Sequence, residues 1–368
     1  GDPLLRLRVP EYPAMIDTIN GSGLTTAVQI KALGDVKLSG RILDDNGNLW
    51  SDFNGEGILT VFDSERSVLL EKMSTISNPF YMKVQGGVIF KGRISVINGE
   101  FESSFVVPKD ISYENKNGKI VFYFLNSNSD GLGYTNQIIV GGTDTTRSND
   151  GAGPQIEIYF DDTSFRNAYL VTPNSKLIVK LSDETGLNTT GTGVGHNLEG
   201  ILNDDKNNPL NLTNYFTGDL DANGKSGEIN YQFSNLEQGE YKIQVKAWDV
   251  FNNFADETTF FSVVSGDELV ISDIYNYPNP FSSNTTFTFQ QNLNSPIDVR
   301  IKIYTVAGRM IKQIEQNAIN EKYVTIDWDG RDEDGDILAN GVYLYKIIVK
   351  TINGDFNKSV LGKIAIIK

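Results

Sequence analysis

The residue best suited to acid–base chemistry is His196, the single histidine of a 368-residue chain that contains no cysteine. Because imidazole is the usual general base near neutral pH, a serine- or cysteine-type hydrolytic mechanism within this chain would need His196. The chain offers no thiol nucleophile, and no Gly-x-Ser-x-Gly turn occurs in its sequence. We therefore expect His196 to be a loop residue that fixes its neighbours by hydrogen bonds, and we expect no catalytic residue in this chain.

A second candidate site is a calcium loop that begins at Asp219. Asp219, Asp221 and Asn223 occupy the first, third and fifth positions of a loop whose sixth residue is glycine, as in an EF-hand. The twelfth position is Asn230 instead of glutamate, and Glu228 comes two residues early. The candidate Ca²⁺ ligands are therefore Asp219, Asp221, Asn223 and Glu228. The favoured alternative is an acidic glycine turn that leads into a strand.

Two other groups of residues could bind a ligand. The acidic stretch 329–336 could also hold Ca²⁺, although a solvated turn is the favoured interpretation. The tryptophans Trp50, Trp248 and Trp328 could stack on sugar rings. Trp248 and Trp328 lie in alternating runs, which favours burial for both. No other cofactor is indicated.

The elements that would position these residues are short strands. Alternating apolar and polar runs are separated by Asn-Gly, Asp-Gly and Pro, which predicts an all-β fold. Residues 88–97 and 100–107 flank Asn98 and Gly99, and this pattern predicts a hairpin with a type I′ turn. The chain is too long for one sandwich, so we expect three tandem immunoglobulin-like β-sandwich domains. The predicted divisions are a sandwich at 12–142, a linker at 143–154, an Ig-like sandwich at 155–264 and a terminal domain at 269–368.

The charge of the chain excludes one class of partner and favours one docking domain. The net charge of −15 argues against nucleic acid, whose phosphates require clustered Lys and Arg. Residues 266–368 hold 11 basic and 13 acidic residues, a net of −2, so about −13 falls on the first 265 residues. The surface of the terminal domain has the least electrostatic self-repulsion, so we expect this domain to dock. No apolar run is long enough to span a membrane, and no signal peptide opens the sequence, so we expect an export signal upstream of Gly1.

Four motifs in the terminal domain resemble a known family. Residues 277–281 (Tyr-Pro-Asn-Pro-Phe), 306–309 (Val-Ala-Gly-Arg), 328–335 (Trp-Asp-Gly-Arg-Asp-Glu-Asp-Gly) and 340–346 (Asn-Gly-Val-Tyr-Leu-Tyr-Lys) occur in this order. The set resembles the C-terminal domain that directs proteins through the type IX secretion system of Bacteroidetes, a relative of the FlgD immunoglobulin-like domain. The resemblance implies a secretion domain at 269–368.

The rest of the chain resembles one enzyme family that carries such a domain. Residues 1–7 (Gly-Asp-Pro-Leu-Leu-Arg-Leu) are similar to the end of a gingipain-type, C25-type cysteine peptidase domain, which we place at 1–11. Residues 193–197 and 245–253 are similar to the middle of the type IX sortases, the PorU family. The resemblance implies a non-catalytic rear region, because the family's catalytic Cys and His would lie upstream of Gly1. Enzymes of this family remove the C-terminal domain of secreted cargo and attach the cargo to lipopolysaccharide.

The same resemblance implies partners and a location. In the family the sortase is held at the cell surface, on the outer membrane, by the barrel protein PorV, in an attachment complex with PorQ and PorZ. We expect the terminal domain to dock there through a sheet edge near 360–368. An alternative is a secreted surface adhesin or carbohydrate-binding protein with the same secretion domain. The expected docking residues are Tyr277, Pro278, Asn279, Pro280, Val360, Ile364 and Ile366.

Overall fold

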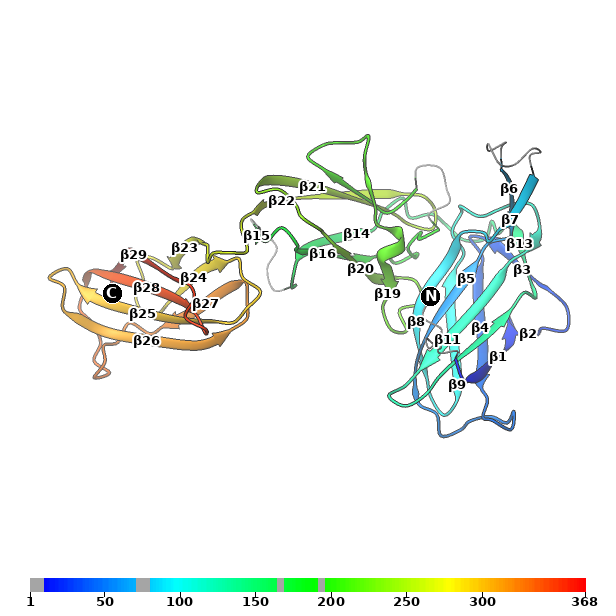
Figure 1. Cartoon of the computed structure of the whole chain (residues 1–368), viewed down its shortest axis with the longest axis horizontal. Helices are drawn as coiled ribbons and strands as arrows, with labels where there is room; N and C mark the ends of the chain where they lie inside the picture. The colour runs from blue at the N-terminus through cyan, green and yellow to red at the C-terminus, as the bar shows by residue number, and fades with distance from the viewer. Residues whose placement is uncertain (1–9, 71–79, 164–168, 191–195) are drawn as a thin grey trace, which may run out of the picture. The chain divides into compact units, whose positions relative to one another are not determined.

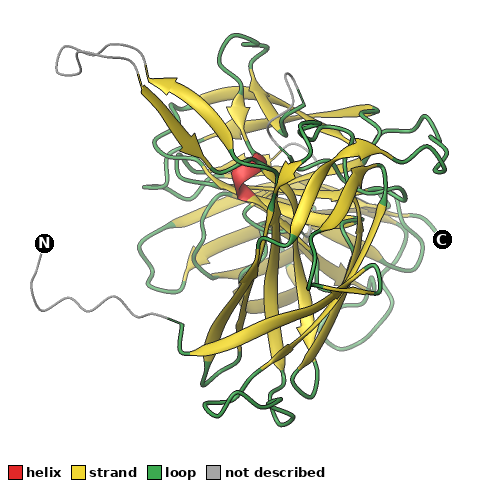
Figure 2. Cartoon of the chain, turned by 90° about the vertical axis from the view of Figure 1, so that its right-hand side faces the viewer, coloured by secondary structure: helices red, strands yellow, loops and turns green. Residues whose placement is uncertain are grey.

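The computed structural model describes residues 10–70, 80–163, 169–190 and 196–368, and strands make up most of them (Figure 2). The one helical element in these ranges is the 3-10 turn η1 (Thr213–Tyr215). The predicted all-β fold is therefore confirmed. No helix in the described ranges is long and apolar enough to cross a membrane. The segment predicted to end a peptidase domain, 1–11, lies outside the described residues apart from its last two.

The described residues group into two compact units. Unit 1 comprises Gly1–Glu157, Val179–Asn230 and Gln244–Thr258. Unit 2 comprises Ile158–Ile178, Tyr231–Ile243 and Thr259–Lys368. The residues of the predicted middle domain thus belong to both units, and the division into three domains stays a prediction.

The first region, within unit 1, is built from strands (Figure 1). Its described residues form thirteen of them. Their bounds are β1 (Tyr12–Ile19), β2 (Ser22–Gly23), β3 (Val28–Ala32), β4 (Asp35–Ile42), β5 (Gly55–Phe62), β6 (Arg66–Leu70), β7 (Phe80–Val84), β8 (Val88–Val96), β9 (Glu100–Val106), β10 (Lys116–Asn117), β11 (Lys119–Leu125), β12 (Asp130–Thr135) and β13 (Ile138–Thr143). The main sheet has the order β8-β5-β11-β12-β1-β4-β9, and β10-β13-β3 and β6-β7 form smaller sheets. Two pairs are parallel, β1 with β12 and β3 with β13.

The turn at Asn98 and Gly99 has the predicted backbone but not the predicted pairing. Both residues have positive φ, 52° and 75°, as a type I′ turn requires. A bridge joins Ile97 to Glu100. Beyond it, however, β8 and β9 stand at opposite ends of the main sheet order, where β8 pairs with β5 and β9 pairs with β4. The turn therefore connects two edges and does not begin a ladder between β8 and β9.

Alternation places the larger apolar side chains of this region in one core. Leu59, Val61, Phe122 and Phe124 are fully buried and come from the neighbouring strands β5 and β11. Gly57 lies opposite Phe124 in the ladder, and a Cβ at Gly57 would stand 2.3 Å from the ring of Phe122. The glycine therefore makes room for the aromatic layer.

The middle region follows with nine strands and η1. Their bounds are β14 (Gln155–Phe160), β15 (Tyr169–Val171), β16 (Lys176–Ser182), β17 (Glu199–Leu202), β18 (Leu210–Asn211), β19 (Phe216–Gly218), β20 (Ser226–Gln232), β21 (Gly239–Trp248) and β22 (Phe254–Val263). They form two sheets with the orders β14-β16-β20-β19 and β15-β22-β21-β17-β18.

The terminal region, within unit 2, has seven strands in two sheets. Their bounds are β23 (Ile271–Tyr277), β24 (Thr285–Gln291), β25 (Ile297–Thr305), β26 (Met310–Ile319), β27 (Tyr323–Trp328), β28 (Gly341–Thr351) and β29 (Asn357–Ile366). The sheet orders are β23-β24-β27 and β26-β25-β28-β29. Phe287, Trp328 and Tyr345 pack between them in a buried aromatic cluster. Pro278 and Pro280 lie between β23 and β24.

Candidate functional site

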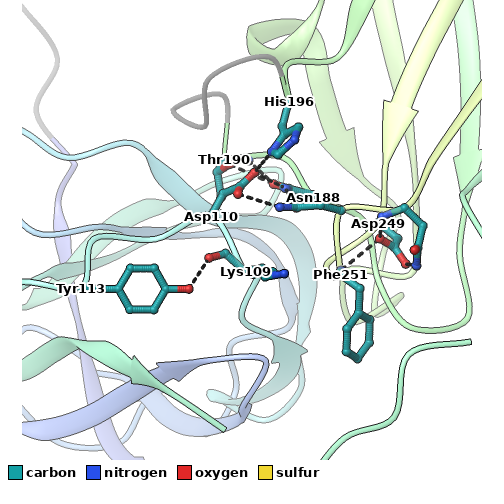
Figure 3. Close-up of polar contacts among 10 residues, drawn as sticks. Lys109, Asp110, Tyr113, Asn188, Thr190, His196, Asp249 and Phe251 are labelled. Atoms are coloured by element: carbon teal, nitrogen blue, oxygen red, sulfur yellow. Dashed lines mark hydrogen bonds and ion pairs between the residues drawn. The ribbon is translucent and has the colours of Figure 1, made fainter. Parts of the chain in front are cut away.

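The carboxylate of Asp110 is the centre of a polar network in unit 1 (Figure 3). Its Oδ2 lies 2.5 Å from His196 Nδ1 and accepts a hydrogen bond from Asn188 Nδ2 at 2.9 Å. Its Oδ1 accepts one from Asn252 Nδ2 at 2.8 Å. The Asp110 side chain is 13% exposed and that of His196 26% exposed. One carboxylate thus holds three segments that are distant in the sequence.

Main-chain bonds surround this network and fix its register. Lys109 N donates to Val250 O at 2.8 Å, and Val250 N donates to Gly186 O at 3.0 Å. Asn188 N donates to Trp248 O at 2.9 Å. The segment after β9 therefore contacts the residues that follow β16 and β21 through backbone and side chains together.

The geometry gives His196 a structural environment. Its ring lies 4.4 Å from the ring of Trp248, and its Nδ1 faces Asp110. A hydrolytic triad would add a nucleophile, but the chain has no cysteine and the hydroxyl of Thr190 donates to Asn188 Oδ1 at 2.9 Å. Of the family-like segment 193–197, residues 193–195 lie outside the described residues.

A buried carboxylate stands beside this network. Asp249 is fully buried, and burial raises the pKa of its carboxyl group. Its Oδ1 accepts hydrogen bonds from Phe251 N at 3.0 Å and Asn253 N at 2.6 Å, and its Oδ2 accepts one from Asn253 Nδ2 at 2.7 Å. These bonds close the turn that joins β21 to β22.

The loop predicted as a calcium site uses its oxygens to bind protein groups. Asp221 accepts hydrogen bonds from Ser95 N at 2.8 Å and Ser95 Oγ at 2.6 Å. Asn223 Oδ1 accepts one from Ser104 N at 3.2 Å. The loop is therefore hydrogen-bonded to β8 and β9.

The two outer candidate ligands of that loop have local partners. Asp219 Oδ2 accepts a hydrogen bond from Ser226 Oγ, and Glu228 Oε1 accepts one from Asn230 Nδ2, both at 2.6 Å. Among the residues that the structure describes, no group of three or more His, Cys, Asp or Glu side chains could hold a metal ion.

The acidic stretch 329–336 forms turns. Asp332 Oδ1 accepts hydrogen bonds from Asp334 N at 3.1 Å and Asp336 N at 2.8 Å. Asp329 Oδ1 accepts one from Arg331 N at 3.1 Å. Carboxylates that bind their own backbone two or more residues on stabilise a solvated turn.

The tryptophans pack inside aromatic clusters. Trp50 lies between Tyr12 and Phe53, with ring centroids at 4.5 and 5.2 Å. Trp248 and Trp328 are 9% and 3% exposed, as their alternating runs predict. Trp50 is half-buried.

Of the predicted docking residues, Asn279 lies against the end of β29 that carries Ile364 and Ile366. Asn279 Nδ2 donates to Lys363 O at 3.1 Å, and Asn279 Oδ1 accepts from Ala365 N at 3.0 Å. Phe281 N then donates to Ala365 O at 3.0 Å, and Ile367 N donates to Phe281 O at 2.9 Å. The edge of β29 from 363 to 367, where a partner strand was expected, is thus occupied by the chain's own residues 279–281.

In the part of the chain that the structure describes, the remaining edge of β29 has no neighbouring strand. The backbone of Ala365 faces outward, so alternation turns that of Leu361 and Ser359 the same way. Leu361 is 70% exposed, and Tyr277 is 75% exposed. Ile364 and Ile366 are buried in the core, so they support this edge from within, and Val360 is half-buried.

The comparisons with known proteins concern this terminal region most directly. Residues 276–355 match the family model of the FlgD Ig-like domain. No curated protein matches the chain. The FlgD Ig-like match covers β24 to β28 completely and the end of β23.

Solved structures give whole-chain similarities. Dimeric latent PorU from Porphyromonas gingivalis is 28% identical, with all of this chain and 35% of that chain covered and a TM-score of 0.42. The chain thus spans about a third of that protein. Two further similarities are weaker. A Salmonella alpha-2-macroglobulin is 8% identical, with 93% of this chain and 23% of that chain covered and a TM-score of 0.22. A tandem repeat of a large adhesion protein is 13% identical, with 96% of this chain and 74% of that chain covered and a TM-score of 0.20. At these TM-scores the superpositions carry no argument about function.

Sequence reasoning missed the centre of the network in unit 1. Asp110, Asn188 and Asn252 come from segments with no shared local pattern, and only the fold brings them together. The available signal was Asn188, which precedes two threonines, and the pair Asn252 and Asn253, since Asn side chains often bridge backbone turns.

Proposed function

We propose that this chain is the non-catalytic region of a PorU-like, cell-surface type IX sortase, and that its FlgD Ig-like domain docks the enzyme on the outer-membrane protein PorV. PorQ and PorZ would belong to the same complex, and the substrate would be secreted cargo proteins. The observation that carries the proposal is the FlgD Ig-like match at 276–355, within which the motifs at 277–281, 306–309, 328–335 and 340–346 keep the order of a type IX secretion domain.

Features of both units support a scaffolding role. The single histidine is held by Asp110 beside Trp248, so it contributes to the packing of unit 1. The terminal region offers the edge of β29 at 357–362, directly after the FlgD Ig-like match, with Leu361 exposed on it. Edge strands pair readily with an added strand, and exposed apolar side chains add affinity. Trp248 and Trp328 are buried, so they do not favour the carbohydrate-binding alternative.

Co-purification with PorV tests the docking role. The full chain should be retained on immobilised PorV, and a version that ends at Gly266 should not. Leu361→Asp places a charge on the open edge and should abolish retention. Ile352→Asp, at another exposed apolar residue (53% exposed, against 70% for Leu361) in the turn after β28, is the control and should be retained.

Two results would count against the proposal. Equal retention of the full chain and of the version ending at Gly266 would remove the docking role. Peptidase activity in the purified 368-residue chain would remove the non-catalytic assignment.

A further inference from the structure

A groove in unit 1 gathers positive charge in a strongly acidic chain. The cavity has a volume of about 700 Å³ and lies between the β6–β7 hairpin and the strands β10, β11 and β12. Lys83, on β7, lines one wall, and Lys116 and Lys119 line the opposite wall. Glu65 is the one acidic residue among its lining residues, although the whole chain carries a net charge of −15. The groove is therefore an island of positive charge.

The lysines are available to a ligand. Lys83 pairs with Glu65 at 3.9 Å, and Lys116 pairs with Glu114. The side chains of Lys83 and Lys116 are 79% and 60% exposed, and pairs at such exposure contribute little to stability. A ligand carboxylate could therefore replace the internal partner at low cost.

The groove also has an aromatic wall. Lys119 Nζ lies 5.4 Å from the ring centroid of Tyr134, whose side chain is 69% exposed. Cation–π contact holds the lysine above the ring and leaves both groups at the surface of the groove. The wall thus offers charge and an apolar face side by side.

The hairpin extends this surface with apolar side chains. Ser67 pairs with Lys83, and Leu69 pairs with Tyr81 one step along the same face, because side chains two residues apart share a face. Leu69 is 44% exposed and Tyr81 72% exposed. In the described part of the chain, β6 and β7 form a sheet of their own, so each has an outer edge without a neighbouring strand.

We propose that this groove binds an acidic peptide segment, whose carboxylates pair with Lys83, Lys116 and Lys119 and whose apolar side chains pack on Leu69 and Tyr81. Charge complementarity selects an anion. The exposed apolar face and the open strand edges favour an extended peptide over a polyanionic sugar, since a peptide can use all three features. The inference does not depend on docking by the FlgD Ig-like domain.

Fluorescence anisotropy with a labelled peptide of alternating glutamate and valine tests the proposal. The full chain should bind it, more weakly as NaCl rises because salt screens exposed charges. The triple variant Lys83→Glu, Lys116→Glu and Lys119→Glu should lose affinity at least about tenfold. The matched control reverses the exposed lysines Lys31, Lys37 and Lys206, which lie outside the groove, and should bind as the parent does.

A second pair of variants tests the apolar face. Leu69→Ser with Tyr81→Ser should weaken binding, whereas Val68→Ser with Met82→Ser, on the opposite face of the same hairpin, should not. Equal affinity of the groove variant and its control would overturn the proposal. Binding of heparin by the groove lysines without binding of the peptide would also overturn it, in favour of a polyanionic sugar.

Discussion

Replacement of Asp110 by alanine tests the network that holds unit 1 together. The change removes the acceptor for His196, Asn188 and Asn252. A hydrogen bond to a charged group contributes about 1.5–3 kcal/mol when both partners are shielded from water. Asn188 keeps a second acceptor, Asn252 Oδ1, at 3.0 Å, and His196 is 26% exposed, which discounts its bond. We therefore expect a loss of about 3 kcal/mol in the free energy of unfolding of unit 1.

Thermal unfolding followed by tryptophan fluorescence is a direct assay, because Trp248 contacts His196. For a unit of this size the loss corresponds to a Tm lower by about 6–12 °C. Asp205→Ala is the control, since the carboxylate of Asp205 binds only Asn207 and Asn208, its near neighbours on an exposed turn. Equal Tm values for Asp110→Ala and the control would refute the reasoning.

Three further predictions concern single contacts. Gly362→Ala should destabilise the terminal region by about 1–3 kcal/mol in chemical denaturation, because the added Cβ would lie 2.1 Å from the Tyr345 ring. Gly341→Ala should not, because its Cβ would meet the Tyr343 ring at an ordinary contact distance of 3.9 Å; equal midpoints for the two variants would contradict this. Lys322→Met should lower the free energy of unfolding by about 3–5 kcal/mol, because it leaves the buried carboxylate of Asp161 (Nζ–Oδ2, 3.4 Å) without a cation. The double variant with Asp161→Asn should recover much of this loss. Additive losses from the two substitutions would argue against the pairing. Burial raises the pKa of Asp63, so the protonated carboxyl group stabilises the fold fully below pH 3.8, and this contribution is lost as pH rises through the raised pKa. The free energy of unfolding of Asp63→Asn should therefore increase relative to that of the parent as pH rises. A constant difference between pH 4 and 8 would exclude the effect.

The positions of strands could be predicted from local sequence patterns, whereas the pairing of one strand with another could not. Apolar alternation is visible in the sequence of β5, β11 and β25, because one face of each strand is buried. Asn98 and Gly99 specified the turn, since both adopt positive φ at little cost. The pairing of β8 and β9 with distant strands depends on which edges meet in the folded sheet, and no short segment encodes that.

The loop that begins at Asp219 shows why composition alone does not distinguish a cation-binding loop from a turn. Asp221 and Asn223 have φ of 55° and 56°, and the glycine after them has φ of 77°. Asp, Asn and Gly suit these left-handed positions for the same reason that they recur in cation-binding loops: short side chains and permissive backbones. The spacing therefore identified the turn correctly, while the partner of its oxygens, the serine-bearing strands β8 and β9, could be seen only in three dimensions.

The parallel pairs at the start of the chain have a consequence for synthesis. β1 can pair with β12 only after more than a hundred further residues have been synthesised, and a similar length of chain separates β3 from β13. Until then the nascent chain carries unsatisfied edges that can capture other polypeptides. A truncated version that stops before Gly131 should therefore aggregate, and any cut intended to isolate this region must keep both of its ends.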